Sequence, residues 1–214
     1  MVLDLLVIGT AITLGPLHNS AFILLLCSRR GVRKGASFLL SWLANLVAVV
    51  ACVVLLTGGK PPAAHSAPST AALAAKLAFG VVLVVFGAHR RRRPSGPPRP
   101  PKWAARVDGL SLGSAAGIAW LLQPWALVGA GAATVVDADL SATATWFALV
   151  GYCLLATLSL IVMEMYTVWA PEAADARLTA LRSWLERHQE QLLVTLSLLA
   201  GLWLTARSIY DLVA

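Results

Sequence analysis

Residues 3–27 read LDLLVIGTAITLGPLHNSAFILLLC, an apolar run with a break in its middle. A helix that crosses a bilayer needs about 20 mostly apolar residues, so this run is long enough. Gly15 and Pro16 interrupt it, and a proline removes a backbone donor and frees a carbonyl. Three polar residues follow at once: His18, Asn19 and Ser20. The stretch predicts a membrane-spanning helix that is broken beside a polar cluster.

Five more apolar segments follow along the chain, over residues 35–56, 70–88, 110–136, 142–166 and 192–212. They are long and continuous rather than alternating, so they predict helices and not the strands of a membrane barrel. We therefore expect an all-α integral membrane protein with six transmembrane helices.

The composition agrees with a membrane protein. Of the 214 residues, 58% are hydrophobic and 13% are charged, and the mean hydropathy is +0.76. A soluble domain is about 45–50% apolar and about 25% charged, so a soluble enzyme is excluded. The net charge of +7 does not indicate nucleic acid as a partner, because the basic residues lie in short loops between apolar runs.

The basic residues alternate between loops. The first, third and fifth loops carry 14 Lys and Arg residues, and the second and fourth carry one, Lys60. The positive-inside rule places the odd loops in the cytoplasm and both termini on the outer side of the plasma membrane. Asp4 and the absence of a basic residue before the first run predict a retained span rather than a secretory signal.

The third loop divides the chain into two halves. Residues 89–109 form a basic, proline-rich linker between residues 1–88 and 110–214. Each half has three spans, so the second half is expected to be inverted relative to the first. Gln123-Pro124 interrupts the fourth span as Gly15-Pro16 interrupts the first, and such paired breaks indicate a substrate site near the membrane midplane. The alternative is that the two prolines only kink their helices.

The candidate substrate-binding residues lie at the breaks and on the third span. We expect His18, Asn19 and Gln123 to face one polar cavity, and Lys76 either to join it and bind an anionic head group or to extend to the outer surface. Alternatively, Asn19 and Ser20 bond a neighbouring helix. His18 also suggests proton coupling, because its side chain titrates near neutral pH. The full set is Pro16, His18, Asn19, Ser20, Lys76, Gln123 and Pro124.

Four further features carry expectations. The spacing of apolar residues over 174–191 predicts an amphipathic helix on the cytoplasmic interface, or else an extension of the sixth span. Arg207 and Asp211 are spaced for an ion pair on one helix. Gly80 and Gly87 suit a close helix contact. Glu164 lies near the cytoplasmic end of the fifth span and is expected at the interface.

Enzyme and cofactor motifs are missing from the sequence. It has no ligand spacing for zinc, haem or an iron–sulfur cluster, and no phosphate-binding or dinucleotide glycine pattern. No nucleophile-elbow motif occurs. We therefore expect no cofactor, no metal site and no enzymatic activity. Cys27, Cys52 and Cys153 are interpreted as small hydrophobic residues.

Several short motifs carry a resemblance to a known family. They are Gly15-Pro16-Leu17, Ser28-Arg29-Arg30 with the following residues 35–43, residues 101–108 before a glycine-rich span broken at Pro124, and residues 181–188 before the last span. Together they resemble the peptidoglycolipid-addressing (GAP) proteins, which include the sulfolipid-addressing protein, of the lysine-exporter (LysE) superfamily. Gln123-Pro124 departs from the Asn-Pro pair usual in that family.

The resemblance implies six spans in two inverted halves. It also implies a transporter or flippase that moves a cell-envelope glycolipid or lipid-linked substrate across the plasma membrane. Two alternatives are an exporter of small, amino-acid-like solutes and a non-transporting accessory of a larger lipid exporter. The expected partners are membrane lipids and an anionic or sugar-bearing lipid substrate. A homodimer and a cell-envelope lipid export complex remain open.

Overall fold

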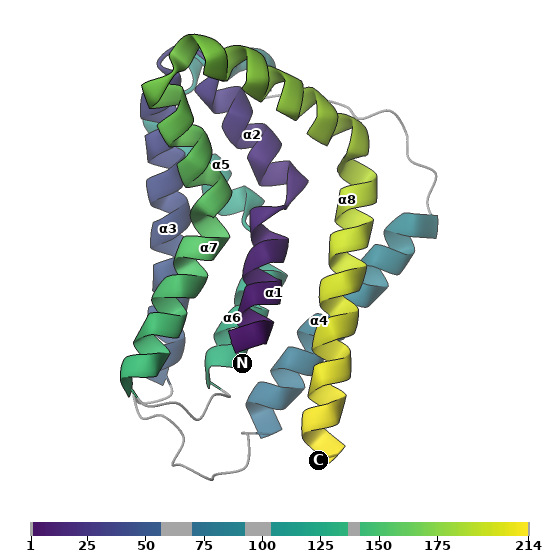
Figure 1. The fold of residues 1–214 in the computed structure, drawn as a ribbon. Helices are drawn as coiled ribbons and strands as arrows, with labels where there is room; N and C mark the ends of the chain where they lie inside the picture. Colours follow the sequence, from purple (N-terminus) through teal and green to yellow (C-terminus); the bar gives the residue numbers. More distant parts are fainter. Residues whose placement is uncertain (1, 57–69, 93–103, 137–141, 214) are drawn as a thin grey trace.

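The computed structural model describes residues 2–56, 70–92, 104–136 and 142–213 (Figure 1). Every regular element in these ranges is a helix, and no strand occurs in them. The elements are α1 (Val2–Thr13), α2 (Pro16–Leu26), α3 (Gly31–Leu56), α4 (Thr70–Arg92), the short 3₁₀ helix η1 (Ala104–Gly109), α5 (Leu112–Leu122), α6 (Trp125–Val136), α7 (Ala142–Trp169) and α8 (Pro171–Val213). The expected all-α class is therefore confirmed.

Both predicted breaks are present. Helices α1 and α2 meet at Gly15 with a bend of 47°, and α5 and α6 meet at Gln123 and Pro124 with a bend of 67°. Within the described residues, three helices are long and apolar enough to cross a membrane, namely α3, α7 and α8, and the number rises to five if each bent pair counts as one span. Helix α4, the third predicted span, is not among them.

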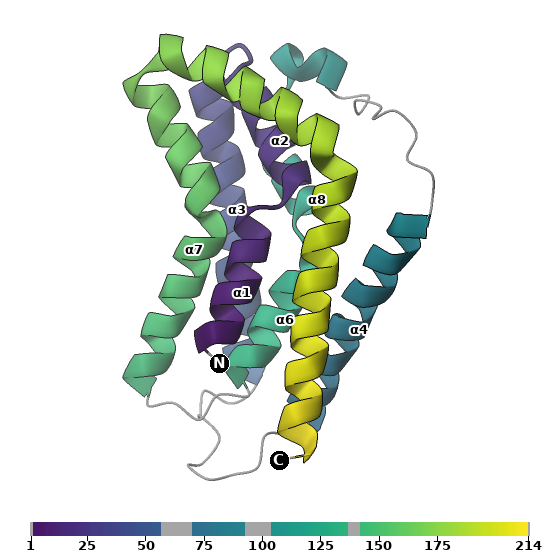
Figure 2. The ribbon, with the colours of Figure 1, turned by 45° about the vertical axis from the view of Figure 1, so that its right-hand side comes forward.

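The helices run side by side, and α8 arches over one end of them (Figures 1 and 2). The first part of α8 crosses that end, and the helix then bends and descends beside α4. The N-terminus and the C-terminus both lie at the opposite end. The predicted amphipathic helix over 174–191 and the predicted sixth span thus form one bent helix.

The crossing part of α8 is amphipathic, as expected. Ala174, Leu178 and Leu185 are buried, and the residues between them are mostly exposed. Leu181 and Trp184, which the same apolar pattern includes, are 40% and 44% exposed. The buried stripe of α8 is therefore narrower than the pattern predicts. The side chains of Leu181 and Trp184 remain on the side of α8 that faces away from the bundle.

Glycines bring α4 and α8 into close contact. A Cβ atom on Gly80 would lie 2.9 Å from the backbone nitrogen of Thr205, and one on Gly201 would lie 2.9 Å from the carbonyl oxygen of Gly80. A Cβ on Gly87 would lie 2.9 Å from Leu198. The close contact predicted at Gly80 and Gly87 is confirmed, and its partner is the last helix of the same chain.

The turn between α2 and α3 lies beside η1 at the end that α8 crosses (Figure 2). Lys34 is buried, and its ammonium group donates to the carbonyl oxygens of Val107 at 2.7 Å and Asp108 at 3.1 Å. The backbone N–H of Arg29 donates to the Asp108 carboxylate at 2.8 Å. These bonds hold η1 against the turn between α2 and α3, so the first loop and the described end of the third loop, which are expected on one side, lie at one end of the bundle.

Candidate functional site at the two helix breaks

The first break lets α2 begin at a proline. Pro16 stands in the first turn of α2, where its missing N–H costs nothing because the first helical donors have no intrahelical partner. Gly15 precedes it as the N-cap residue and donates its N–H to Ile12 at 3.0 Å. A Cβ on Gly15 would lie 2.4 Å from Cε1 of His18, so the glycine makes room for the imidazole.

Asn19 satisfies the carbonyl groups that this break frees. Its amide nitrogen donates to the carbonyl oxygens of Thr13 at 2.8 Å and Gly15 at 2.9 Å. Its amide oxygen accepts a hydrogen bond of 2.9 Å from the hydroxyl of Ser159 on α7. Thr13 also donates from its hydroxyl to the carbonyl oxygen of Leu155. Asn19 therefore holds the break together and ties it to α7, as the helix-bonding alternative expects.

His18 lies in an aromatic environment. Its side chain is 2% exposed, and its ring centroid is 4.6 Å from that of Trp42 on α3. Phe38, one turn earlier on α3, stacks on Trp42 with centroids 6.0 Å apart. The Nε2 atom of His18 has no hydrogen-bond partner in the structure, and neither do Nε1 of Trp42 and the buried hydroxyl of Ser20.

Asn45 adds a polar group that the sequence analysis did not select. It follows Trp42 by three residues, which places both on one side of α3. Its amide nitrogen is buried and has no partner. The sequence indicates such a residue only by the presence of a polar side chain within the apolar run 35–56.

The second break differs from the first in its hydrogen bonding. Gln123 ends α5 in an extended conformation, and the carbonyl oxygen of Pro124 accepts from Leu127 at 2.9 Å and Val128 at 3.0 Å to start α6. Gln123 is 4% exposed, and neither its amide nitrogen nor its amide oxygen has a hydrogen-bond partner. Its side-chain amide therefore makes no hydrogen bond with His18 or Asn19.

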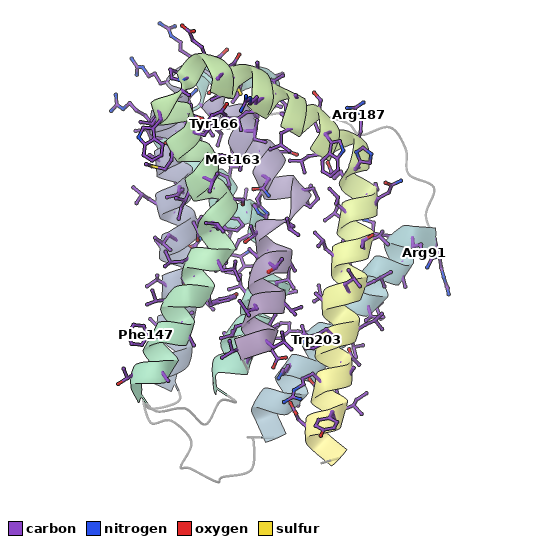
Figure 3. The ribbon with its side chains drawn as sticks, viewed as in Figure 1. Arg91, Phe147, Met163, Tyr166, Arg187 and Trp203 are labelled. Carbon is purple, nitrogen blue, oxygen red and sulfur yellow. The ribbon has the colours of Figure 1, made fainter. Side chains whose placement is uncertain are left out.

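Lys76 lies in a separate charged cluster near the end that holds the termini. Its ammonium group is 3.3 Å from the carboxylate of Asp4 on α1 and 3.8 Å from that of Asp211 on α8. Asp4 also accepts a 2.9 Å hydrogen bond from the indole of Trp203, a residue on the descending part of α8 (Figure 3). Both charged side chains of the Lys76–Asp4 pair are 2% exposed.

This cluster answers two expectations. The predicted ion pair between Arg207 and Asp211 is confirmed, with a distance of 3.3 Å. Lys76 is buried among carboxylates rather than extended to the surface. Asp4 and Trp203 were not selected from the sequence, although a carboxylate inside an apolar run was a signal for a buried partner.

Comparison with known protein families gives a match over most of the chain. Residues 5–210 match the family model described as "Sap, sulfolipid-1-addressing protein". The chain belongs to the sulfolipid-1-addressing protein family. The match spans both breaks, Lys76 and η1, whereas Asp4 and Asp211, the carboxylate partners of Lys76, lie just outside it. Neither curated proteins nor solved structures give a match.

Proposed function

We propose that this sulfolipid-addressing family protein is a transporter that moves a cell-envelope glycolipid, or another lipid-linked substrate, across the plasma membrane. The supporting observation is a set of buried polar atoms without partners. Nε2 of His18 and both amide atoms of Gln123 lie at the breaks, and Nε1 of Trp42 and Nδ2 of Asn45 lie on α3, where the Trp42 ring packs on His18. Buried polar groups nearly always have a partner. A sugar or sulfate head group would supply those partners, because its hydroxyl groups can donate to the amide oxygen of Gln123 and its oxyanion and hydroxyl oxygens can accept from the N–H groups.

In this proposal the head group binds at the breaks while the acyl chains stay in lipid. The first turns of α2 and α6 follow Pro16 and Pro124, and the positive end of a helix dipole favours an anionic group there. Lys76 is not needed for this step, because its charge is already balanced by Asp4 and Asp211. Asn19 shapes the site, since its amide is used by the helix backbone.

We further propose six spans arranged as two inverted halves, with α4 as the third span. The pairing of Lys76 with Asp4 supports this, because a paired charge costs less inside a membrane than an isolated one. Lys34 after the first loop bonds η1 in the third loop, and the two termini lie at the opposite end of the bundle. Both observations are consistent with odd loops in the cytoplasm and both termini on the outer side of the membrane.

Cysteine labelling tests this orientation. In a background whose three native cysteines are replaced by serine, Lys60→Cys is expected to react with a membrane-impermeant maleimide in intact cells. Arg99→Cys is expected to react only after permeabilisation, because it lies in a cytoplasmic loop. Labelling of Arg99→Cys in intact cells would show that the orientation is reversed.

A second candidate function is that of a non-transporting accessory of a larger lipid exporter. The observation in its favour is the dense packing around the first break, where Trp42, Phe38 and Phe22 are fully buried. A core that stays filled would stabilise a partner without passing a substrate. The two candidates differ in whether the purified chain alone moves lipid.

Substitution of the unpartnered polar residues tests the transport proposal. His18→Ala and Gln123→Ala are each expected to lower the movement of a fluorescent sulfated glycolipid in vesicles about tenfold or more. The physical reason is that a buried hydrogen bond to a charged group contributes about 1.5–3 kcal/mol. Gln123→Ala should keep a thermal stability near that of the unmodified protein, because its amide has no hydrogen-bond partner in the folded chain. His18→Ala should lose some stability, because it removes a buried ring that packs on Trp42. Transport is therefore compared per folded molecule.

His89→Ala and Gln191→Ala are matched controls, since these residues are of the same types but exposed. Both controls should move the lipid at the unmodified rate. Unchanged transport in His18→Ala and Gln123→Ala, with folding intact, would show that these side chains do not bind the substrate and would contradict a substrate site at the breaks.

A further inference from the structure

Glu164 lies on α7 close to the end where α7 meets α8. It stands between Met163 and Tyr166, which mark this level of the helix in Figure 3. Both oxygen atoms of its carboxyl group are buried, and neither has a hydrogen-bond partner in the structure. The carboxyl group therefore packs inside the protein, and the expected position of Glu164 near the membrane interface stays a prediction.

A glycine on α3 makes the space for this carboxyl group. A Cβ on Gly35 would lie 2.2 Å from Oε2 of Glu164 and 2.6 Å from Cδ2 of Leu26. Any larger residue at position 35 would displace the carboxyl group. The end of α2, the start of α3 and the end of α7 thus converge on Glu164 and leave room for it against an apolar neighbour.

The charged and titratable groups on the neighbouring elements make other contacts. Lys34 on α3 bonds Ser28 and the carbonyl oxygens of η1. The thiol of Cys27, after α2, is 3.9 Å from the hydroxyl of Thr179. On α8, the guanidinium of Arg177 lies 5.9 Å from the ring centre of Tyr166. Arg33 on α3 and Asp175 on α8 are exposed.

An ionised carboxylate is costly at such a place. Burial of a charge without a partner is strongly unfavourable, so the group either holds a proton or binds a cation. A metal cation such as Na⁺ or Ca²⁺ needs several oxygen ligands. In the part of the chain that the structure describes, no group of three or more His, Cys, Asp or Glu side chains is placed to hold a metal ion. A proton needs only one carboxylate oxygen, so we take the proton as the ligand and test sodium separately.

We propose that Glu164 is the proton-binding site that couples lipid movement to the proton gradient. The inference rests on the proposed transport function and names its energy source. In each cycle one carboxylate oxygen forms an O–H bond with a proton taken from water on the outer side. The same bond breaks when the proton passes to water on the cytoplasmic side, while one lipid head group moves outward. No other bond changes.

The first test measures the proton on Glu164 directly. Infrared difference spectra of the purified protein in lipid nanodiscs, recorded between about pH 5 and pH 8, should contain a protonated-carboxyl band that changes with pH. Glu164→Gln should remove that band, and Gly35→Ala should shift its titration because the added methyl group displaces the carboxyl group. Glu190→Gln is the matched control, since Glu190 is partly exposed and paired with Arg90 at 3.0 Å. A titrating band that persists in Glu164→Gln would overturn the proposal.

The second test measures coupling in vesicles that contain the fluorescent sulfated glycolipid. An imposed pH gradient should change the rate of lipid movement by up to about tenfold per pH unit, the limit for one proton. Glu164→Gln should fold, because glutamine has the shape of the neutral acid, and its rate should not respond to the gradient. A sodium gradient at constant pH should have no effect on the unmodified protein.

These outcomes distinguish a failure of the proton-coupling role from a failure of the transport function. Lipid movement that responds to sodium, or a Glu164→Gln variant that still responds to pH, would overturn the coupling role. If the unmodified protein moves no lipid in either condition, the transport function fails, and the infrared titration still decides whether Glu164 binds the proton.

Discussion

Lys76→Met is expected to destabilise the protein by about 3–5 kcal/mol. Removal of one partner of a buried ion pair leaves the other charge buried and unpaired, which is the costly outcome. Here that charge is the carboxylate of Asp4, which is 2% exposed and 3.3 Å from the Lys76 ammonium group. The loss should be visible as a large fall in thermal stability in detergent and in the amount of folded protein in the membrane.

Two further variants make this prediction specific. Arg207→Met is the control, because it removes a 43% exposed cation from Asp211 and should cost no more than about 1 kcal/mol. Asp4→Asn combined with Lys76→Met should recover much of the loss, since asparagine still accepts from the Trp203 indole and carries no charge. Equal stability of Lys76→Met and Arg207→Met would contradict the buried pair.

Asn19→Ala is expected to destabilise the protein by about 1–3 kcal/mol, the cost of leaving buried polar groups unsatisfied. The substitution frees the carbonyl oxygens of Thr13 and Gly15 and the hydroxyl of Ser159 at once. Ser159→Ala removes only one of these bonds and should cost about 0.5–1.5 kcal/mol. Thermal unfolding followed by circular dichroism compares the two.

The same pair of variants separates a structural role from a binding role. Lipid movement per folded molecule should be nearly unchanged in Asn19→Ala, because its amide already bonds the helix backbone. An Asn19→Ala protein of full stability that moves no lipid would show instead that this amide contacts the substrate.

The positions of the helices could be predicted because they depend on local patterns. Apolar runs of spanning length and the two prolines determine where the helices form and break, and the structure has helices over each run and breaks at Gly15 and Gln123. The single bent helix α8 was harder to predict from the sequence. An amphipathic surface helix and a span can follow each other with no residue that marks an end between them.

The partners of the polar residues could not be predicted, because they lie far apart along the chain. Asn19 meets Ser159 across 140 positions, and Lys76 meets Asp4 across 72. A single sequence indicates that a polar residue in a span needs a partner, but not which one. Hence the sequence predicts that Asn19 faces a cavity beside Gln123, whereas the Asn19 amide bonds α1 and α7 and the side-chain amide of Gln123 makes no hydrogen bond.

The central claim is that this chain alone moves a lipid across a membrane. The most direct measurement uses the purified protein in vesicles that carry a fluorescent sulfated glycolipid in both leaflets, with an impermeant reductant added outside. The account predicts that probe from the inner leaflet reaches the reductant much faster than in protein-free vesicles. A rate equal to that of protein-free vesicles would contradict it and leave the accessory function, and movement of an amino acid without movement of the lipid would indicate a small-solute exporter.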